Sequence, residues 1–144
     1  MISNFANEYN IKDLEKAQST KHAYHFLNPI MLFHIRLFEG EYKSSLTGMI
    51  LSLGIYRDIV KKYIKLLIKD GLVERSIMSV YDKDHNQPVW PFLLTKEGKI
   101  KVNENEKHYS EIYILFPKVM NRIRSEREER KRLFKYTFQN GFSA

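Results

Sequence analysis

Five cationic side chains recur within one stretch of the chain that is also rich in aliphatic residues. The sequence LGIYRDIVKKYIKLLIKDGLVER covers residues 53–75, and its pattern predicts a helix over residues 56–69. At about 100° per residue, the apolar residues fall on one arc of that helix and the cations on the opposite arc. The apolar arc holds Val60, Tyr63, Ile64 and Leu67, with Tyr56 at its edge, and the basic arc holds Arg57, Lys61, Lys62, Lys65 and Lys69.

A row of cations on one helix face suits a polyanionic partner. Lysine acts on a phosphate as a point charge, whereas arginine can also bind guanine through two parallel hydrogen bonds. Asp58 is an acid beside this row, and it would either accept from a cytosine amino group or pair with Lys62 four residues later. Between residues 57 and 75, six cations stand against three acids, a net charge of +3. The alternative interpretation is an ordinary solvated helix face.

The segment before this helix offers a second set of polar groups. KSSLTGMILSLG, residues 43–54, predicts a short helix that a serine caps and that Gly54 ends in a turn. The first N–H groups of such a helix can bind a phosphate. Simple capping is the alternative, and the two roles are compatible. The candidate residues are Lys43, Ser44, Ser45 and Thr47.

After residue 71 the hydrophobic period changes from helical to extended. LVERSIMSVY (72–81) and VWPFLLT (89–95) predict two short strands, and DKDHNQP between them predicts a polar turn. Trp90 and Phe92 are expected to pack at the base of this hairpin. The alternative for its polar residues is a hairpin tip without a partner. The candidate contact residues here are Arg75, Lys83, His85, Asn86 and Gln87.

Helices are also predicted around this central region. Residues 11–26 are expected to form one helix. Asn28 is expected to cap the next helix, with Pro29 at its first position and Gly40 after its end. Thr95 is expected to cap a short helical or irregular link.

A long helix is predicted from His108, and its two halves differ. The first half carries an apolar stripe that, together with the first helix, is the expected dimer contact; packing onto its own domain is the alternative. In the second half, eight cations stand against three acids between residues 118 and 135, which favours either a solvated, ion-paired helix or contact with phosphates. The expected dimer residues are Leu14, Tyr109, Ile112, Tyr113, Phe116, Met120 and Ile123.

Composition limits the classes of protein that fit. The 144 residues suit one domain, or one domain with an added oligomerisation helix. The net charge of +7 and the pI of about 9.5 favour nucleic acid first and an anionic membrane surface second. The absence of cysteine excludes disulfide scaffolds and cysteine-rich zinc sites. Neither a signal peptide nor an apolar run near the roughly 18 residues of a spanning helix is present, so we expect a cytoplasmic protein without a membrane partner.

Catalytic motifs are missing from the sequence. No Gly-rich phosphate loop, nucleophile elbow or HExxH motif occurs. His22 and His25, with His34 further on, lack the carboxylate and cysteine context of a metal site. We therefore expect no enzyme, no catalytic residue, no metal and no cofactor.

The order of these elements and several short sequence words resemble the MarR and PadR families of winged helix-turn-helix transcriptional regulators. The words are LNP at the second helix, LG before the basic helix, DGLVER after it and LTKEG after the second strand, all within residues 27–102. The resemblance implies a DNA-binding dimer with helix 56–69 in the major groove and the DKDHNQP loop along the backbone or minor groove. It also implies that the first and last helices pair two subunits. The loop departs from the families' usual Asp-x-Arg, since it has no arginine.

The expected fold is α+β, mainly α: a winged helix-turn-helix with N-terminal and long C-terminal helices for dimerisation. Residues 1–26 would form a helical arm, 27–102 the DNA-binding domain, and 103–144 the C-terminal helix with a basic end and tail. We expect a sequence-specific regulator of transcription, a repressor, that binds double-stranded DNA as a homodimer. The alternatives are a plasmid or viral replication or partition protein and a protein-interaction module that binds no DNA. A small-molecule effector is left open.

Overall fold

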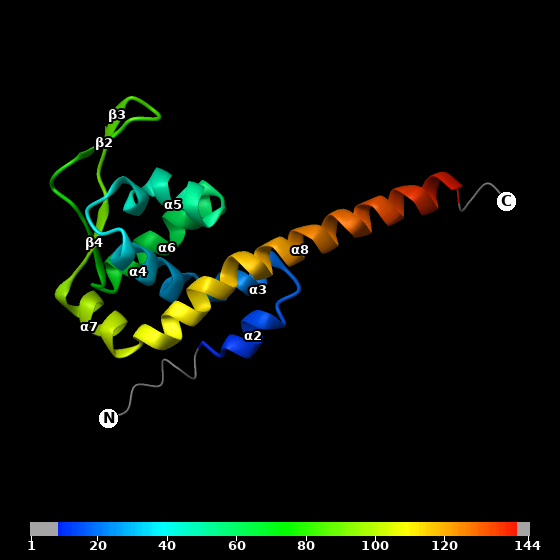
Figure 1. The fold of residues 1–144 in the computed structure, drawn as a ribbon, viewed down its shortest axis with the longest axis horizontal. Helices are drawn as coiled ribbons and strands as arrows, with labels where there is room; N and C mark the ends of the chain where they lie inside the picture. The colour runs from blue at the N-terminus through cyan, green and yellow to red at the C-terminus, as the bar shows by residue number, and fades with distance from the viewer. Residues whose placement is uncertain (1–8, 141–144) are drawn as a thin grey trace.

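Helices form most of the chain, and two short antiparallel ladders complete it (Figure 1). The computed structural model describes residues 9–140, with side chains described through residue 137. The sequence of elements confirms the predicted mainly helical winged helix-turn-helix. The elements are α2 (Ile11–Glu15), α3 (Thr20–Ala23), η1 (Tyr24–Phe26), α4 (Leu27–Leu37), η2 (Tyr42–Ser44), α5 (Leu46–Leu53), α6 (Arg57–Lys69), β1 (Val73–Arg75), β2 (Val80–Asp82), β3 (Gln87–Val89), β4 (Phe92–Leu94), α7 (Lys96–Glu104) and α8 (Glu106–Asn140).

The predicted single helix over residues 11–26 is wrong, because the chain forms three short elements there. The Asn10 side chain accepts from the Lys12 N–H at 2.9 Å and starts α2. The Ser19 hydroxyl then accepts from the His22 N–H at 3.2 Å and starts α3. A serine that caps a new helix takes an extended backbone, so one continuous helix cannot pass through it.

Asn28 does not cap α4, contrary to the prediction. The 3-10 turn η1 leads straight into α4, so Asn28 is the second residue of the helix, and Phe26 holds the cap position without a side-chain hydrogen bond. Pro29 still lies in the first turn, where its missing N–H leaves no helical hydrogen bond unmade. Gly40 follows the end of α4 with a φ of 78°, as a helix-ending glycine should.

The two predicted strands are present, but each is divided in two, and the outer pair extends into the predicted turn, because Asp82 ends β2 and Gln87 and Pro88 begin β3. β1 pairs antiparallel with β4, with Val73 opposite Leu94, and β2 pairs with β3, with Val80 opposite Val89. Between these ladders, residues 76–79 of one arm face only residues 90–91 of the other, which makes a bulge. The Ser76 hydroxyl, which accepts from the Met78 N–H at 3.1 Å, holds the bulge. The outer ladder, β2 and β3, forms the wing that rises from the body in Figure 1.

α8 packs its apolar stripe against the rest of its own chain. It contacts α2, α3, α4 and α7, and the core that results draws on all three predicted segments of the sequence. The stripe residues are 0 to 1% exposed, except for the half-buried Tyr113, whose ring lies 5.3 Å from that of Phe33. A second copy cannot reach side chains that their own chain already covers. The burial of Leu14, Tyr109, Ile112, Phe116, Met120 and Ile123 corrects their expected dimer contact to packing within one chain, whereas Tyr113 keeps part of its surface exposed, so its dimer contact stays a prediction.

His34 ties α8 to the segment that precedes α5. Its imidazole is buried, with Nε2 2.8 Å from the Lys43 carbonyl oxygen and Nδ1 2.7 Å from the Tyr113 hydroxyl. A carbonyl only accepts, so Nε2 carries the proton and Nδ1 accepts from Tyr113. Burial lowers the pKa of His34 and raises the pKa of Tyr113, so both side chains are neutral near pH 7.

Within residues 9–140, no helix combines the length with the apolar character that crossing a bilayer requires.

Replacing Phe116 tests whether the α8 stripe belongs to the monomer core. Phe116 is 1% exposed, so Phe116→Ala should lower the free energy of unfolding by about 3–5 kcal/mol. Ile114 on the same helix is 61% exposed, and Ile114→Ala should cost less than about 1 kcal/mol. Urea unfolding followed by circular dichroism measures both, and equal losses would contradict the packing described.

The buried His34 should make stability depend on pH. Its folded pKa lies below the ordinary 6.5, so below that pH the unfolded chain binds a proton that the folded chain does not. The free energy of unfolding should therefore fall as the pH drops through 6.5, and His34→Gln should flatten that decline. Urea titrations between about pH 7.5 and about pH 5 measure the slopes. The exposed His25, changed to Gln, is the control, and an unchanged slope in His34→Gln would refute the assignment.

Candidate nucleic-acid interface

α6 buries one face and presents the other, with its cations, to solvent. Val60 is 0% exposed, Leu67 1% and Ile64 4%, so the predicted apolar arc is the buried arc. No acidic group of the described residues lies within ion-pair distance of the α6 cations, and this includes Asp58, whose expected pair with Lys62 does not form. We call the exposed set the basic face of α6; it consists of Arg57, Lys61, Lys62, Lys65 and Lys69.

Two glycine turns fix where α6 begins and ends. Gly54 closes α5 in the left-handed conformation, with a φ of 65° and its N–H donating to the Ile50 carbonyl at 3.0 Å. Tyr56 then holds the cap position of α6 in an extended conformation and is 78% exposed. At the other end Gly71 has a φ of 75°, just after α6 ends at Lys69, which is the predicted last residue of the helix. An L-residue with a Cβ would be strained at either glycine.

A small cleft lies where α5, α6 and the wing meet. Its volume is about 140 Å³, and it is lined by Thr47 of α5, Arg57 of α6, Arg75 of β1 and Trp90, among others. Both arginines are exposed, and the Arg75 guanidinium also lies over the Phe92 ring, 5.8 Å from its centroid. Two arginines on separate elements and a threonine around one cleft make a setting suited to a phosphate. Sequence reasoning placed Arg75 on the hairpin but missed this meeting with Arg57, because only the fold joins them.

The start of α5 corrects two of the expected contacts. The Ser44 hydroxyl is buried and donates to the carbonyls of Glu41 at 3.0 Å and Phe92 at 3.2 Å. The Ser45 hydroxyl, 2% exposed, caps the helix by accepting from the Gly48 N–H at 3.1 Å. Neither serine side chain is available to an external phosphate, because each is enclosed and already hydrogen-bonded. Capping by Ser45 is confirmed.

The other two candidates of this segment remain accessible. Lys43 is exposed, and its Nζ lies 4.8 Å from the centroid of the Phe38 ring. Thr47 is partly exposed and lines the cleft. Thr47 therefore adjoins Arg57 of the basic face of α6, whereas Lys43 is accessible beside Phe38.

The wing tip is built around a buried aspartate. Asp82 is 1% exposed and accepts from the Asp84 N–H at 3.0 Å and from the His85 N–H at 3.3 Å, while its other oxygen lies 2.7 Å from His85 Nδ1. Asn86, with a φ of 55°, accepts from the Tyr81 hydroxyl. His85 and Asn86, expected as contacts, are thus engaged in shaping the turn. Lys83 and Gln87 are exposed beside them, as the prediction requires.

The long helix reaches the turn that precedes α6. Arg124 of α8 donates from Nη2 to the Gly54 carbonyl. Burial raises the pKa of Tyr24, the positive charges of Arg124 and Arg127 lower it, and Tyr56 raises it. Arg124, Arg127 and Tyr56 therefore lie near Tyr24. No local sequence pattern signals this contact, because it joins residues 70 positions apart.

His34 does not join His22 and His25, which together line a separate pocket. His34 is enclosed in its hydrogen bonds to Tyr113 and Lys43, away from the exposed His22 and His25. Within the described part of the chain, no group of three or more histidine, cysteine or acidic side chains is placed to hold a metal ion.

Comparison with known proteins adds a likeness in fold. No protein-family model matches the chain, and no curated protein matches it significantly. Among solved structures, the chain is similar to a mutant of Lactococcus lactis ZitR in apo form, with 17% identity, a TM-score of 0.43, and coverage of 99% of this chain and 100% of that chain. It is also similar to the adhesin competence repressor AdcR of Streptococcus pyogenes, with 20% identity, a TM-score of 0.39, and coverage of 98% of this chain and 94% of that chain. Likeness of this degree carries no function to this chain, and the winged helix-turn-helix rests on its own elements.

Proposed function

We propose that this protein binds double-stranded DNA as a homodimer and regulates transcription, acting as a repressor that occupies a promoter. One observation carries the proposal: the basic face of α6 is exposed, has no acidic neighbour in ion-pair range among the described residues, and adjoins the cleft of Arg57 and Arg75. A solvated helix face would need neither the cleft nor a second cationic element beside it. A phosphate backbone uses both.

In this proposal α6 enters the major groove. Its first turn carries Arg57, the one residue of the basic face that can recognise guanine by two parallel hydrogen bonds, and the lysines that follow contact phosphates. Arg75 and Thr47 would hold a phosphate at the cleft, and Lys83 and Gln87 of the wing would follow the adjacent backbone. Two copies would place their α6 helices about 34–36 Å apart on a near-palindromic site.

The distal part of α8 is the element we assign to the second copy. All residues from 124 to 137 are exposed, and Leu133 is 55% exposed and Phe134 72%. An isolated helical end of this length is only marginally stable in water. A partner helix would cover Leu133, whereas the stripe closer to the body is already covered by its own chain.

The experiment that tests the proposal is binding to random-sequence and genomic duplex DNA across a salt series. If one copy neutralises about five phosphates, its affinity should fall roughly 500-fold between about 50 and about 200 mM salt. Changing Lys61, Lys62 and Lys65 together to Glu should weaken binding by at least about 100-fold at low salt, because three attractions become repulsions. Fluorescence anisotropy gives the affinities, and sequencing of the bound fraction gives the site.

The matched control changes three exposed lysines elsewhere to Glu: Lys12 of α2, Lys21 of α3 and Lys107 of α8. It alters the net charge equally and should keep most of the affinity. Enriched sites in promoters support the regulator, whereas sites confined to replication origins point to the replication alternative. Absence of wild-type binding at low salt would refute the proposal and leave a protein-interaction module.

A further inference from the structure

The distal half of α8 has a charge pattern that the proposed function does not use. Between residues 124 and 135, six cations stand against three acids, all on one exposed helix. Each acid lies close to a cation of the same helix: Glu126 is 3.5 Å from Arg122, Glu128 3.8 Å from Lys131, and Glu129 2.6 Å from Arg132. Within the described residues, Arg127, Arg130 and Lys135 have no acid in ion-pair range.

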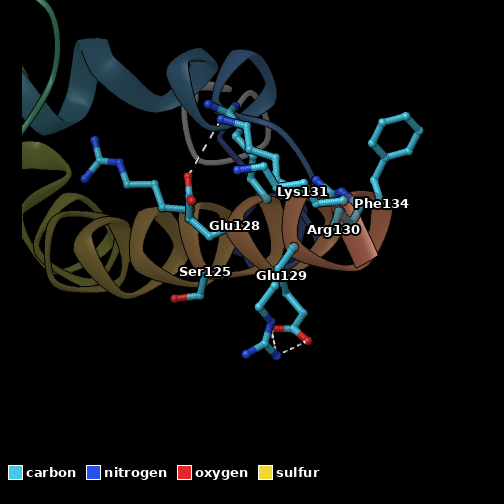
Figure 2. A pocket seen from close by; sticks show the side chains of 10 residues that line it. Ser125, Glu128, Glu129, Arg130, Lys131 and Phe134 are labelled. Atoms are coloured by element: carbon cyan, nitrogen blue, oxygen red, sulfur yellow. Dashed lines mark hydrogen bonds and ion pairs between the residues drawn. The ribbon is translucent and has the colours of Figure 1, made fainter. Parts of the chain in front are cut away.

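Four of these cations form a row along one side of the helix. We call them the basic edge of α8: Arg124, Arg127, Lys131 and Lys135, spaced three, four and four residues apart. That spacing keeps successive side chains on neighbouring turns of one side. Figure 2 shows Glu128, Lys131 and Phe134 leaving the helix on one side, and Ser125 and Glu129 on the other. Over eleven residues the row is about 17 Å long.

The basic edge starts at the turn that begins α6. Arg124 donates to the Gly54 carbonyl, two residues before the exposed Tyr56 at the cap of α6. Arg127, one turn further along α8, lies with Arg124 close enough to Tyr24 to act on its ionisation, as does Tyr56. Figure 1 shows α8 continuing from this point well beyond the body of the protein. The basic edge is therefore continuous with the start of the proposed DNA-reading helix.

We propose that the basic edge of α8 contacts the sugar–phosphate backbone of the same duplex that α6 reads, beyond the base pairs under α6. The inference rests on the proposed function and adds a second, sequence-independent contact to it. A row of cations about one helical turn apart matches a phosphate backbone, which presents charges at regular intervals.

A lipid surface fits this helix less well. An amphipathic helix that lies on a membrane needs one wide apolar face. Here Leu133 and Tyr136, three residues apart, share one side of the helix, whereas Phe134 leaves it in another direction, so the exposed apolar residues form no wide face. The regular feature of the segment is its row of cations.

The test compares two double variants of the full chain with equal charge change. The edge variant is Arg127→Gln with Lys131→Gln. The control variant is Lys118→Gln with Arg132→Gln, which stand seven residues either side of Ser125 and so share its side of the helix, away from the basic edge. All four side chains are exposed, so circular dichroism and the melting temperature should match wild type.

The readout is the slope of log Kd against log salt for the duplex enriched by the wild-type protein. Loss of two phosphate contacts from each copy should reduce the slope by about 1.8 per bound copy in the edge variant, or about 3.6 for a dimer, and leave it unchanged in the control. The affinity deficit of the edge variant should accordingly shrink about tenfold per bound copy between roughly 50 and roughly 200 mM salt. Lys135→Gln alone should reduce the slope by about 0.9 per bound copy, which tests the far end of the row.

Equal slopes for the edge variant, the control and wild type would overturn the inference while the proposed function stands. Equal reductions in both variants would also overturn it, because they would reflect net charge and not a located contact. A third outcome is that the wild type binds phosphatidylserine vesicles, the edge variant does not, and both have the same slope of log Kd for DNA against log salt. That outcome would assign the basic edge to a membrane surface instead. If wild type binds no DNA at low salt, the proposed function fails first and the inference falls with it.

Discussion

The burial of one face of α6 is the constraint on which the rest of the structure depends. Val60, Ile64 and Leu67 leave water almost completely, and a helix with a single apolar arc can do this in one orientation only. The five cations must then face outward, whatever they bind. Their exposure alone would be explained by packing. What favours DNA is the surface that the fold adds beside them, where two arginines and a threonine from three elements surround one small cleft.

α8 helps to fix the orientation of α6 through contacts with the segments around it. Its apolar stripe packs on α4, and three of its polar side chains reach separate parts of the chain. Arg122 donates to the carbonyls of Glu15 at 3.0 Å and Ala17 at 2.6 Å, Arg124 donates to the turn before α6, and Tyr113 donates to His34. His34 in turn holds the segment that leads into α5. The N-terminal segment, both helices of the helix-turn-helix and the long helix therefore form one connected frame.

Local sequence rules predicted the helices and turns better than they predicted which surfaces of the protein those elements pack against. The arcs of α6, the caps by Ser45 and Thr95 and the turn at Gly71 follow from side chains and backbone within a few residues. The stripe of α8 was also visible, but periodicity shows that a face is apolar and not which surface covers it. That surface turned out to be the same chain.

Contacts between distant residues had no sequence signal at all. In the sequence, Ser44 looks like any solvent-facing serine before a helix. In the structure, its hydroxyl donates a hydrogen bond to the Phe92 carbonyl, 48 residues away. The meeting of Arg57 with Arg75 and the Arg124 contact at Gly54 depend equally on tertiary structure. The break at Ser19 was predictable in principle, because serine favours caps over helix interiors.

Because the apolar stripe of α8 is buried within the monomer, a dimer must form through other residues. Each chain carries a net charge of +7, so two copies repel each other in free solution. The distal α8 offers ion pairs that are exposed and contribute about 0–1 kcal/mol each, so exchanging them for pairs between chains gains little. Apolar side chains such as Leu133 would supply most of the attraction, over a small area. A polyanion bound by both copies offsets their repulsion, so in the proposed complex DNA strengthens the dimer as the dimer strengthens binding to DNA.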